Sequence, residues 1–195
     1  MSSRKTVWQQ FSKEIQATYV KGGFTKSARI EATFKSWQIV YDIFVVIAGT
    51  VIFEYTRLRA PIAAKSEFKI RISKKSFFHK IAGKFRKANI ATGDSSVDNA
   101  FVIKSNSAEK AKKLLSNEKL KSLLLESPKT DFEISHGYKS VGRKFPKNCD
   151  GLSLIVLFDN KDEEKLMLLY NLFCEILTSL HEAGEIDDTT INVKI

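Results

Sequence analysis

Apolar residues recur at every second position over a long stretch in the first third of the chain. One set comprises Trp37, Ile39, Tyr41, Ile43, Val45 and Ile47. A period of two residues returns side chains to the same face of a β-strand, so it indicates a strand and not an amphipathic helix. The intervening positions include Val40, Phe44 and Val46, so both faces are largely apolar. This pattern predicts a central strand that is covered on both sides.

Shorter alternations on either side of this strand predict further strands. They cover residues 30–34, 51–56, 68–72, 100–103, 132–134 and 152–158. Ala48-Gly49 is typical of a hairpin turn, and Pro61 predicts the end or the edge of the strand that follows. The local order predicts an antiparallel meander of roughly five to seven strands with helices packed against it.

Apolar residues at three- and four-residue steps predict helices at both ends of the chain. Near the start these are Trp8, Phe11, Ile15 and Tyr19, followed by Gly22 and Gly23. A helix over 161–183 has Asn160 as its expected cap, with Glu163 placed to reach back to it. Two further helical stretches are expected, one from Ser107 to Ser127-Pro128 and one that carries Phe77, Ile81 and Phe85. The predicted fold class is therefore α+β, a mainly antiparallel sheet packed by helices in a single domain over 1–195, with an N-terminal helix and a long C-terminal helix.

Composition agrees with a core that needs neither metal nor disulfide. The chain has 195 residues, 43% of them hydrophobic, including 14 Phe. Its start is polar, with no apolar region of the kind found in a signal peptide, and the apolar stretch 39–53 is too short to span a bilayer easily. We therefore expect a cytoplasmic protein without a transmembrane segment. Cys149 and Cys174 are then expected to be free thiols.

Charge is distributed unevenly along the chain, whose formal net charge is +10. Residues 57–121 contain 17 Lys and Arg against 5 Asp and Glu, whereas residues 150–190 contain 2 against 10. Such asymmetry is typical of a partner surface, and it is equally typical of two parts of one fold that attract each other.

The basic segment supplies the candidate anion-binding residues. They are Arg57, Arg59, Lys69, Arg71, Lys74, Lys75, Lys84, Arg86 and Lys87, to which Lys80 adds a further charge. Phe77, Phe78 and Phe85 lie among them, so the segment could bind nucleic acid, another polyanion or anionic lipid headgroups. For Arg57 and Arg59 we favour a structural role instead, in which they pair with carboxylates of the same fold. The acidic start of the C-terminal helix, at Asp162, Glu163 and Glu164, is the expected partner.

No catalytic, metal-binding or cofactor-binding constellation is recognisable. The three histidines, His79, His136 and His181, have no Cys or His at ligand spacing, and Asp94 and Asp98 share a turn without the spacing of a calcium loop. Cys149 lies in a basic loop beside Lys144 and Lys147, whose charges would lower the pKa of a thiol, and His136 or His181 could complete a dyad. The loops of nucleotide-binding motifs are absent from the sequence. We predict no cofactor, and an enzyme would need Asp42, Asp94, His79, His136 or Cys149 to converge in space.

Three segments carry a resemblance to a known group of proteins. They are EYTRLRAP at 54–61, NIATGD at 89–94 and FVIKSN at 101–106, together with Asp98. They resemble a pattern in an uncharacterised family of bacterial proteins, in which an early Trp and Phe precede a strand ending in Thr-Arg, a Gly-Asp turn and an apolar strand ending in Lys-x-Asn. The resemblance covers the first two thirds of the chain. That family has no named function, so it implies a bacterial cytoplasmic protein and no activity or site.

Function is therefore predicted largely from what the sequence lacks. We expect a non-catalytic binding or interaction module with an unknown ligand and a candidate protein partner. Nucleic-acid or other polyanion binding through residues 57–121 is the first alternative, and an enzyme whose site is invisible in the sequence is the second.

Overall fold

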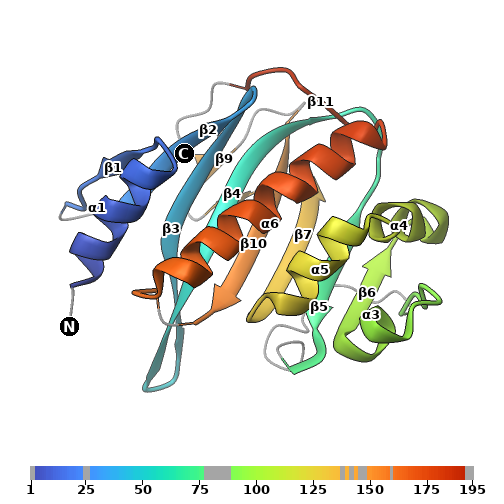
Figure 1. The fold of residues 1–195 in the computed structure, drawn as a ribbon, viewed down its shortest axis with the longest axis horizontal. Helices are drawn as coiled ribbons and strands as arrows, with labels where there is room; N and C mark the ends of the chain where they lie inside the picture. Colours follow the sequence, from blue (N-terminus) through green and yellow to red (C-terminus); the bar gives the residue numbers. More distant parts are fainter. Residues whose placement is uncertain are drawn as a thin grey trace.

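The computed structural model describes residues 3–23, 27–76, 89–136, 139–140, 143–144, 149–158 and 160–191. The predicted α+β class is confirmed, with an antiparallel sheet and helices that include one at the N-terminus and a long one near the C-terminus (Figure 1). The helices are α1 (Arg4–Glu14), α3 (Ser95–Ala100), α4 (Ala108–Leu115), α5 (Glu118–Glu126) and α6 (Glu163–Glu182). The strands are β1 (Thr18–Val20), β2 (Arg29–Phe34), β3 (Trp37–Ala48), β4 (Val51–Ala64), β5 (Ile70–Lys74), β6 (Phe101–Ser105), β7 (Lys129–His136), β8 (Lys139–Ser140), β9 (Arg143–Lys144), β10 (Asp150–Leu157) and β11 (Ile186–Asp187).

Strand order differs from the predicted meander. The main sheet has nine strands in the order β1-β2-β3-β4-β10-β7-β5-β6, with β11 paired to β4, and β8 and β9 form a separate pair. Only β1 to β4 follow one another as a meander. The late strand β10 lies between β4 and β7 and pairs antiparallel with both. The expected five to seven strands were too few, because short pairings such as β1 with β2 and β11 with β4 leave little trace in the sequence.

Pro61 neither ends β4 nor lies at an edge of the sheet. It lies inside the strand, opposite Gly151 of β10. On the other side of β4, pairing with β3 stops at Arg59 and pairing with β11 begins at Ala63. Proline lacks the backbone N–H that a continuous ladder needs, and this gap between two ladders accommodates it.

Helix ends also differ from the predicted ones. α1 ends at Glu14 because Gln16 adopts a left-handed backbone, with φ of 54°, and Tyr19 then belongs to β1. The helical stretch after Ser107 is split into α4 and α5, and Asn117 caps the second of them. Asp162, not Asn160, caps α6, since its side chain accepts from the backbone N–H of Lys165. The predicted helix with Phe77, Ile81 and Phe85 lies outside the described residues.

One face of the sheet and the helices enclose the hydrophobic core. Leu166, Phe173 and Leu180 of α6 are completely buried, together with Leu58 of β4 and Leu154 of β10. α1 joins this layer through aromatic contacts, because the rings of Trp8 and Phe11 lie 5.8 and 5.6 Å from that of Tyr41 in edge-to-face arrangements. Within the described part of the chain, no helix combines the length and the apolar character needed to cross a membrane.

Candidate interaction surface

The strands β3 and β4 extend beyond the rest of the sheet as a two-stranded hairpin. β2 pairs with β3 only as far as Asp42, and β10 pairs with β4 only from Thr56 onward. Pairing between β3 and β4 continues from these residues to Ala48 and Val51. Residues 43–55 therefore form a projection, which we call the hairpin tip, visible at the lower left of Figure 1.

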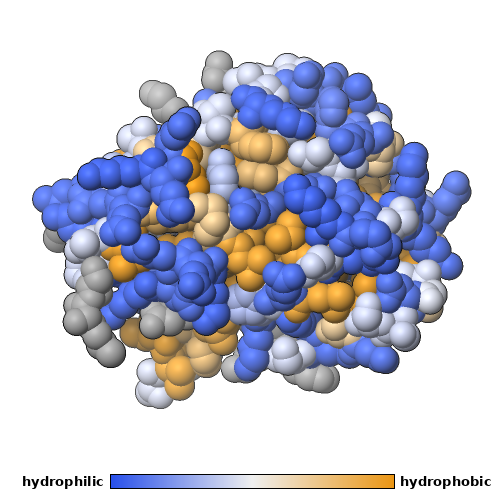
Figure 2. All heavy atoms as spheres, in the orientation of Figure 1, coloured by the Kyte–Doolittle hydropathy of each residue, from blue (hydrophilic) through white to orange (hydrophobic). Residues whose placement is uncertain are grey.

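The hairpin tip carries large apolar side chains that are exposed. Among the described residues, the large hydrophobic side chains that are exposed are Ile47 at 71%, Ile52 at 65%, Val51 at 50% and Val45 at 45%. Figure 2 shows them as an apolar protrusion at the lower left of the surface. Single exposed apolar residues are common on proteins, but a contiguous group of them marks an interaction surface.

The end of the hairpin is built by a turn that favours glycine. Gly49 adopts φ of 63°, in the left-handed region that residues with a Cβ rarely occupy. A Cβ added there would meet no heavy atom within 4 Å, so the need for glycine is conformational and not steric. The predicted Ala48-Gly49 turn is thus present.

The base of the hairpin tip is held against α1. The guanidinium of Arg4 lies 2.9 Å from the carboxylate of Glu54, and both side chains are about half exposed. A shallow cavity of about 260 Å³ lies beside this ion pair, lined in part by Lys5, Ile43 and Val45. On the hairpin itself, the guanidinium of Arg57 stacks over the ring of Phe44 at 4.8 Å. These contacts fix the direction in which the hairpin leaves the sheet.

The predicted partner of Arg57 and Arg59 was wrong. Both arginines bind Asp42, Arg57 through two N–H···O contacts of 2.9 Å, and all three residues are buried. Asp42 lies directly opposite Arg57 in the register of β3 and β4. Leu58 and Ala60 of β4 point into the core with α6. Arg57 and Arg59 alternate with them along the strand, so they point to the other face of the sheet, away from Asp162 and its neighbours.

The remaining described candidates for anion binding lie in β5 or next to its ends. Arg71 forms a buried ion pair with Asp131 at 2.8 Å. The ammonium of Lys74 donates to the carbonyl oxygens of Leu125 and Ser127, and burial lowers its pKa. Lys75 is exposed and Lys69 is half-buried, whereas Lys84, Arg86 and Lys87 lie outside the described residues. Arg71 lies in register with Arg59 through Ser153 and Glu133, on the same face of the sheet. Anion binding by this segment stays a prediction.

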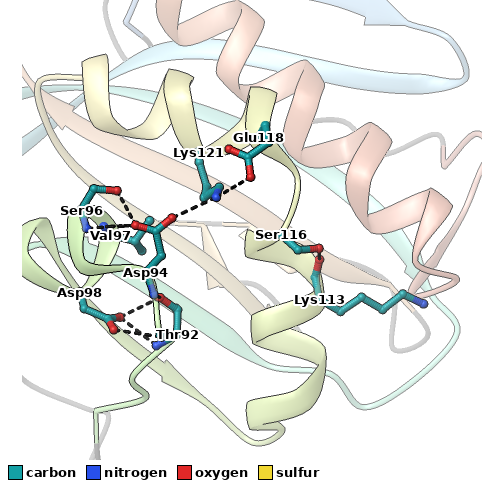
Figure 3. A network of polar contacts seen from close by, with 10 residues as sticks. Thr92, Asp94, Ser96, Val97, Asp98, Lys113, Ser116, Glu118 and Lys121 are labelled. Atoms are coloured by element: carbon teal, nitrogen blue, oxygen red, sulfur yellow. Dashed lines mark hydrogen bonds and ion pairs between the residues drawn. The ribbon is translucent and has the colours of Figure 1, made fainter.

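Asp94 and Asp98 organise the turn before α3 (Figure 3). Asp98 accepts hydrogen bonds from the N–H and hydroxyl of Thr92, both at 2.8 Å, and from the N–H of Gly93 at 3.1 Å. Asp94 caps α3 and pairs with Lys121 at 3.0 Å. Hydrogen bonds from the side chains of Ser96 and Lys121 hold the pKa of Asp94 far below its usual value. The open cavity of about 530 Å³ beside this turn is lined in part by residues of this network, among them Asp94 and Lys121, and in part by Lys112 and Leu115 of α4.

Neither cysteine is an activated nucleophile. Both are buried free thiols. Burial raises the pKa of Cys149 to about 11 and that of Cys174 to about 12, which corrects the expected lowering at Cys149. His181 packs edge-on against Trp37, with ring centroids 5.8 Å apart, while His79 and the side chain of His136 lie outside the described residues.

The other candidate catalytic residues are not brought together. Asp42 is held by two arginines, Asp94 caps α3, and Cys149 donates to the carbonyl oxygen of Asp150 at the start of β10. Across the described residues, no three His, Cys, Asp or Glu side chains gather in a way that could hold a metal ion.

Sequence reasoning did not identify the hairpin tip. It interpreted the apolar second face of β3 as buried, whereas residues 43–48 extend past the strands that would cover them. The available signal was the lack of any charged residue between Asp42 and Glu54, combined with the Ala48-Gly49 turn.

Comparison with known proteins gives the fold and no family. No protein family and no curated protein matches the chain. A solved structure with a similar fold is that of the mycobacterial trehalose monomycolate transport factor A, TtfA, with a TM-score of 0.50. The two sequences are 8% identical over 92% of this chain and 97% of that one. At this identity the likeness shows a shared fold alone.

Proposed function

We propose that this protein is a non-catalytic interaction module, a single α+β domain over 1–195, that contacts its partner through the hairpin tip. The observation that carries the proposal is the concentration of the exposed apolar side chains Ile47, Ile52, Val51 and Val45 on this one projection. Exposed apolar surface is costly in water and raises the risk of aggregation, so a folded chain keeps it where a partner covers it.

Two other observations support a binding role. Those candidate catalytic residues whose side chains the structure describes are engaged in an ion pair or a cap, as with Asp42 and Asp94, or are buried thiols of raised pKa, as with Cys149. The mycobacterial protein of similar fold is named a transport factor, which agrees with a non-catalytic role. Two unpaired cysteines also agree with the reducing environment of a cytoplasm, where we place the protein.

The proposal is tested by site-specific photo-cross-linking in the cells that produce the protein. A photoreactive amino acid replaces Ile47 on the hairpin tip in one variant and Thr189, an exposed residue beyond β11 at the opposite end of β4, in a control variant. We expect cross-linked products from position 47 that are absent from position 189 and that disappear when unlabelled wild-type protein competes. Equal cross-linking from both positions would show that the hairpin tip is not the contact surface.

Polyanion binding through residues 57–121 remains the alternative proposal. It predicts binding to mixed DNA or RNA that weakens steeply as salt rises. Three of its candidate residues, Arg57, Arg59 and Arg71, already contact internal carboxylates. The absence of salt-sensitive binding at low ionic strength would remove this alternative.

A further inference from the structure

We infer that the hairpin tip inserts into the surface of a lipid membrane that carries anionic headgroups. The inference rests on the proposed function, because it names the partner of the same surface. Four properties of the hairpin tip support it: apolar residues on both of its faces, its length, its exposed area and its basic surroundings.

The hairpin tip is apolar on both of its faces. The register places Ile47 opposite Ile52 on one face and Val46 opposite Phe53 on the other. Residues 43–53 are eleven consecutive residues without a charge. A protein that docks on a two-stranded ribbon covers one of its faces, whereas the acyl region of a membrane surrounds both. Apolar character on both faces therefore favours lipid.

The length of the hairpin tip matches part of a single leaflet. Residues 43–48 extend about 16 Å at ~3.3 Å per residue, which is close to half of the ~30 Å hydrocarbon core of a bilayer. In the described part of the chain, β3 beyond Asp42 has no strand on the side away from β4, so backbone groups along that side need water or headgroup partners. The insertion is therefore shallow, with Val51 and Ile47 among the acyl chains and Glu54 near the headgroups.

The exposed area of the hairpin tip favours lipid over a second copy of the chain. Its four exposed large apolar residues are far fewer than the ~20–30 residues that each partner contributes to a typical stable protein interface. Two copies that pair tip to tip would also repel each other, because each chain carries a formal net charge of +10. Insertion into lipid requires no such minimum of area, and it scales with whatever apolar surface is buried.

Charge around the hairpin tip complements an anionic surface. Arg4 and Lys5 are exposed beside its base, where Arg4 also neutralises Glu54. The strands β3 and β5 run in the same direction through the sheet, so Lys75, which follows β5, is exposed at the same end. Basic residues near a membrane surface add attraction to anionic lipids that acts together with apolar insertion.

The first test is co-flotation of the full chain with vesicles of phosphatidylcholine, with and without phosphatidylglycerol. We expect the wild-type protein to float with the mixed vesicles and less with phosphatidylcholine alone. The double variant Ile47→Ser/Ile52→Ser should lower the partition coefficient at least about tenfold. Lys5→Gln should weaken binding to the mixed vesicles at low salt, whereas Lys112→Gln on the distant helix α4 makes the same charge change and should have no effect. Circular dichroism of each variant confirms that the sheet is intact.

A second measurement locates the inserted residue. The natural tryptophans, Trp8 and Trp37, are each 1% exposed, so vesicles should leave their emission unchanged, and the difference between the spectra of Val51→Trp and the wild type reports on the added ring. Its emission should shift to the blue and be quenched by brominated acyl chains, whereas a Trp at Thr189 should show neither change.

The outcomes separate the inference from the proposed function. Flotation that is unaffected by Ile47→Ser/Ile52→Ser, or no flotation with phosphatidylglycerol vesicles, overturns the inference. If position 47 then still cross-links a specific protein in cells, the proposed function stands with a protein partner. A concentration-dependent dimer in sedimentation that this double variant abolishes, without vesicle binding, would instead identify a second copy of the chain as the occupant.

Discussion

Asp42 and Arg57 lie opposite each other across β3 and β4 and form a two-point ion pair, with both N–H···O contacts at 2.9 Å. The pair lies where the hairpin tip begins, because pairing of β2 with β3 ends at Asp42 and pairing of β10 with β4 ends at Thr56. Arg59 binds the same carboxylate. The root of the exposed hairpin is thus a buried cluster of one acid and two arginines.

Removing this acid should destabilise the protein strongly. Asp42→Ala leaves two buried guanidinium groups without their carboxylate, and breaking a buried pair in this way costs about 3–5 kcal/mol. Glu31→Ala is the control, because it removes the exposed partner of Arg29 and should cost less than about 1 kcal/mol. Urea unfolding of both variants measures the difference. Equal losses would show that the Asp42 cluster contributes no more than a surface pair.

The thiols should resist labelling in the native protein. Cys149 is 1% exposed and burial raises its pKa to about 11, so at pH 8 both the access to its sulfur and its thiolate fraction are low. Cys174 is also buried, and burial raises its pKa to about 12. We expect neither thiol to react with Ellman's reagent until denaturant is added, while Thr189→Cys supplies one rapidly labelled control. Fast labelling of native Cys149 would contradict its burial.

Because the pKa of Cys149 is raised, the free energy of unfolding at alkaline pH should depend on this thiol. In the unfolded chain the thiol ionises near its ordinary pKa of 9.0, whereas in the folded protein it stays protonated to about 11. The unfolded state therefore releases its proton first, and the free energy of unfolding falls as the pH rises through this window. Cys149→Ala should show a shallower decline between pH 8 and pH 10 in denaturant titrations. An unchanged slope would indicate that the two states have similar thiol pKa values.

The hairpin turn should tolerate Asn and reject β-branched residues at position 49. Gly49 has φ of 63°, so Gly49→Val places a branched side chain in the left-handed region, at a cost on the order of 1–2 kcal/mol. Gly49→Asn should cost less, because Asn enters this region more readily. Hydrogen exchange of the hairpin amides, compared with those of β10, reports whether the loss is local. If the hairpin amides of Gly49→Val and Gly49→Asn exchange at the same rate, backbone strain at position 49 does not cause the loss of stability.

Asp94 should lose its stabilising effect at low pH. The hydrogen bond from the Ser96 side chain and the contact with Lys121 depress its pKa in the folded state. Its contribution is therefore present above the unfolded pKa, near 3.8, and is lost as the pH falls toward the folded value. Asp94→Asn should make stability less dependent on pH below about 4. We expect the free energies of unfolding of the wild type and Asp94→Asn, measured by denaturant titration, to converge as the pH falls. A gap that stays constant with pH would contradict the depressed pKa.

Local patterns in the sequence predicted the elements better than their arrangement. The two-residue period from Trp37 to Ile47 and the apolar face that includes Leu166 and Phe173 correspond to β3 and α6. The position of β10 was not predictable, because side-chain periodicity sets which face a strand presents and not which strand lies beside it. The ion pair of Asp42 with Arg57 depends on register, which the local pattern does not assign.

The hairpin tip was missed for a related reason. Phe44 and Val46 are apolar on the second face of β3, a pattern shared by a strand covered on both sides and by a ribbon that projects beyond the sheet, where both residues are half-buried. Only the neighbouring strands decide between the two, and these end at Asp42 and Thr56.

The position of β10 between β4 and β7 has a consequence for biosynthesis. A nascent chain that has emerged only to residue 149 holds β4 and β7 without the strand that joins them, so two apolar strand edges await a segment still to be made. The sheet cannot close before β10 has been made, and α6, which packs on the sheet, is made after it. The chain that still lacks β10 is therefore the form that most needs a chaperone.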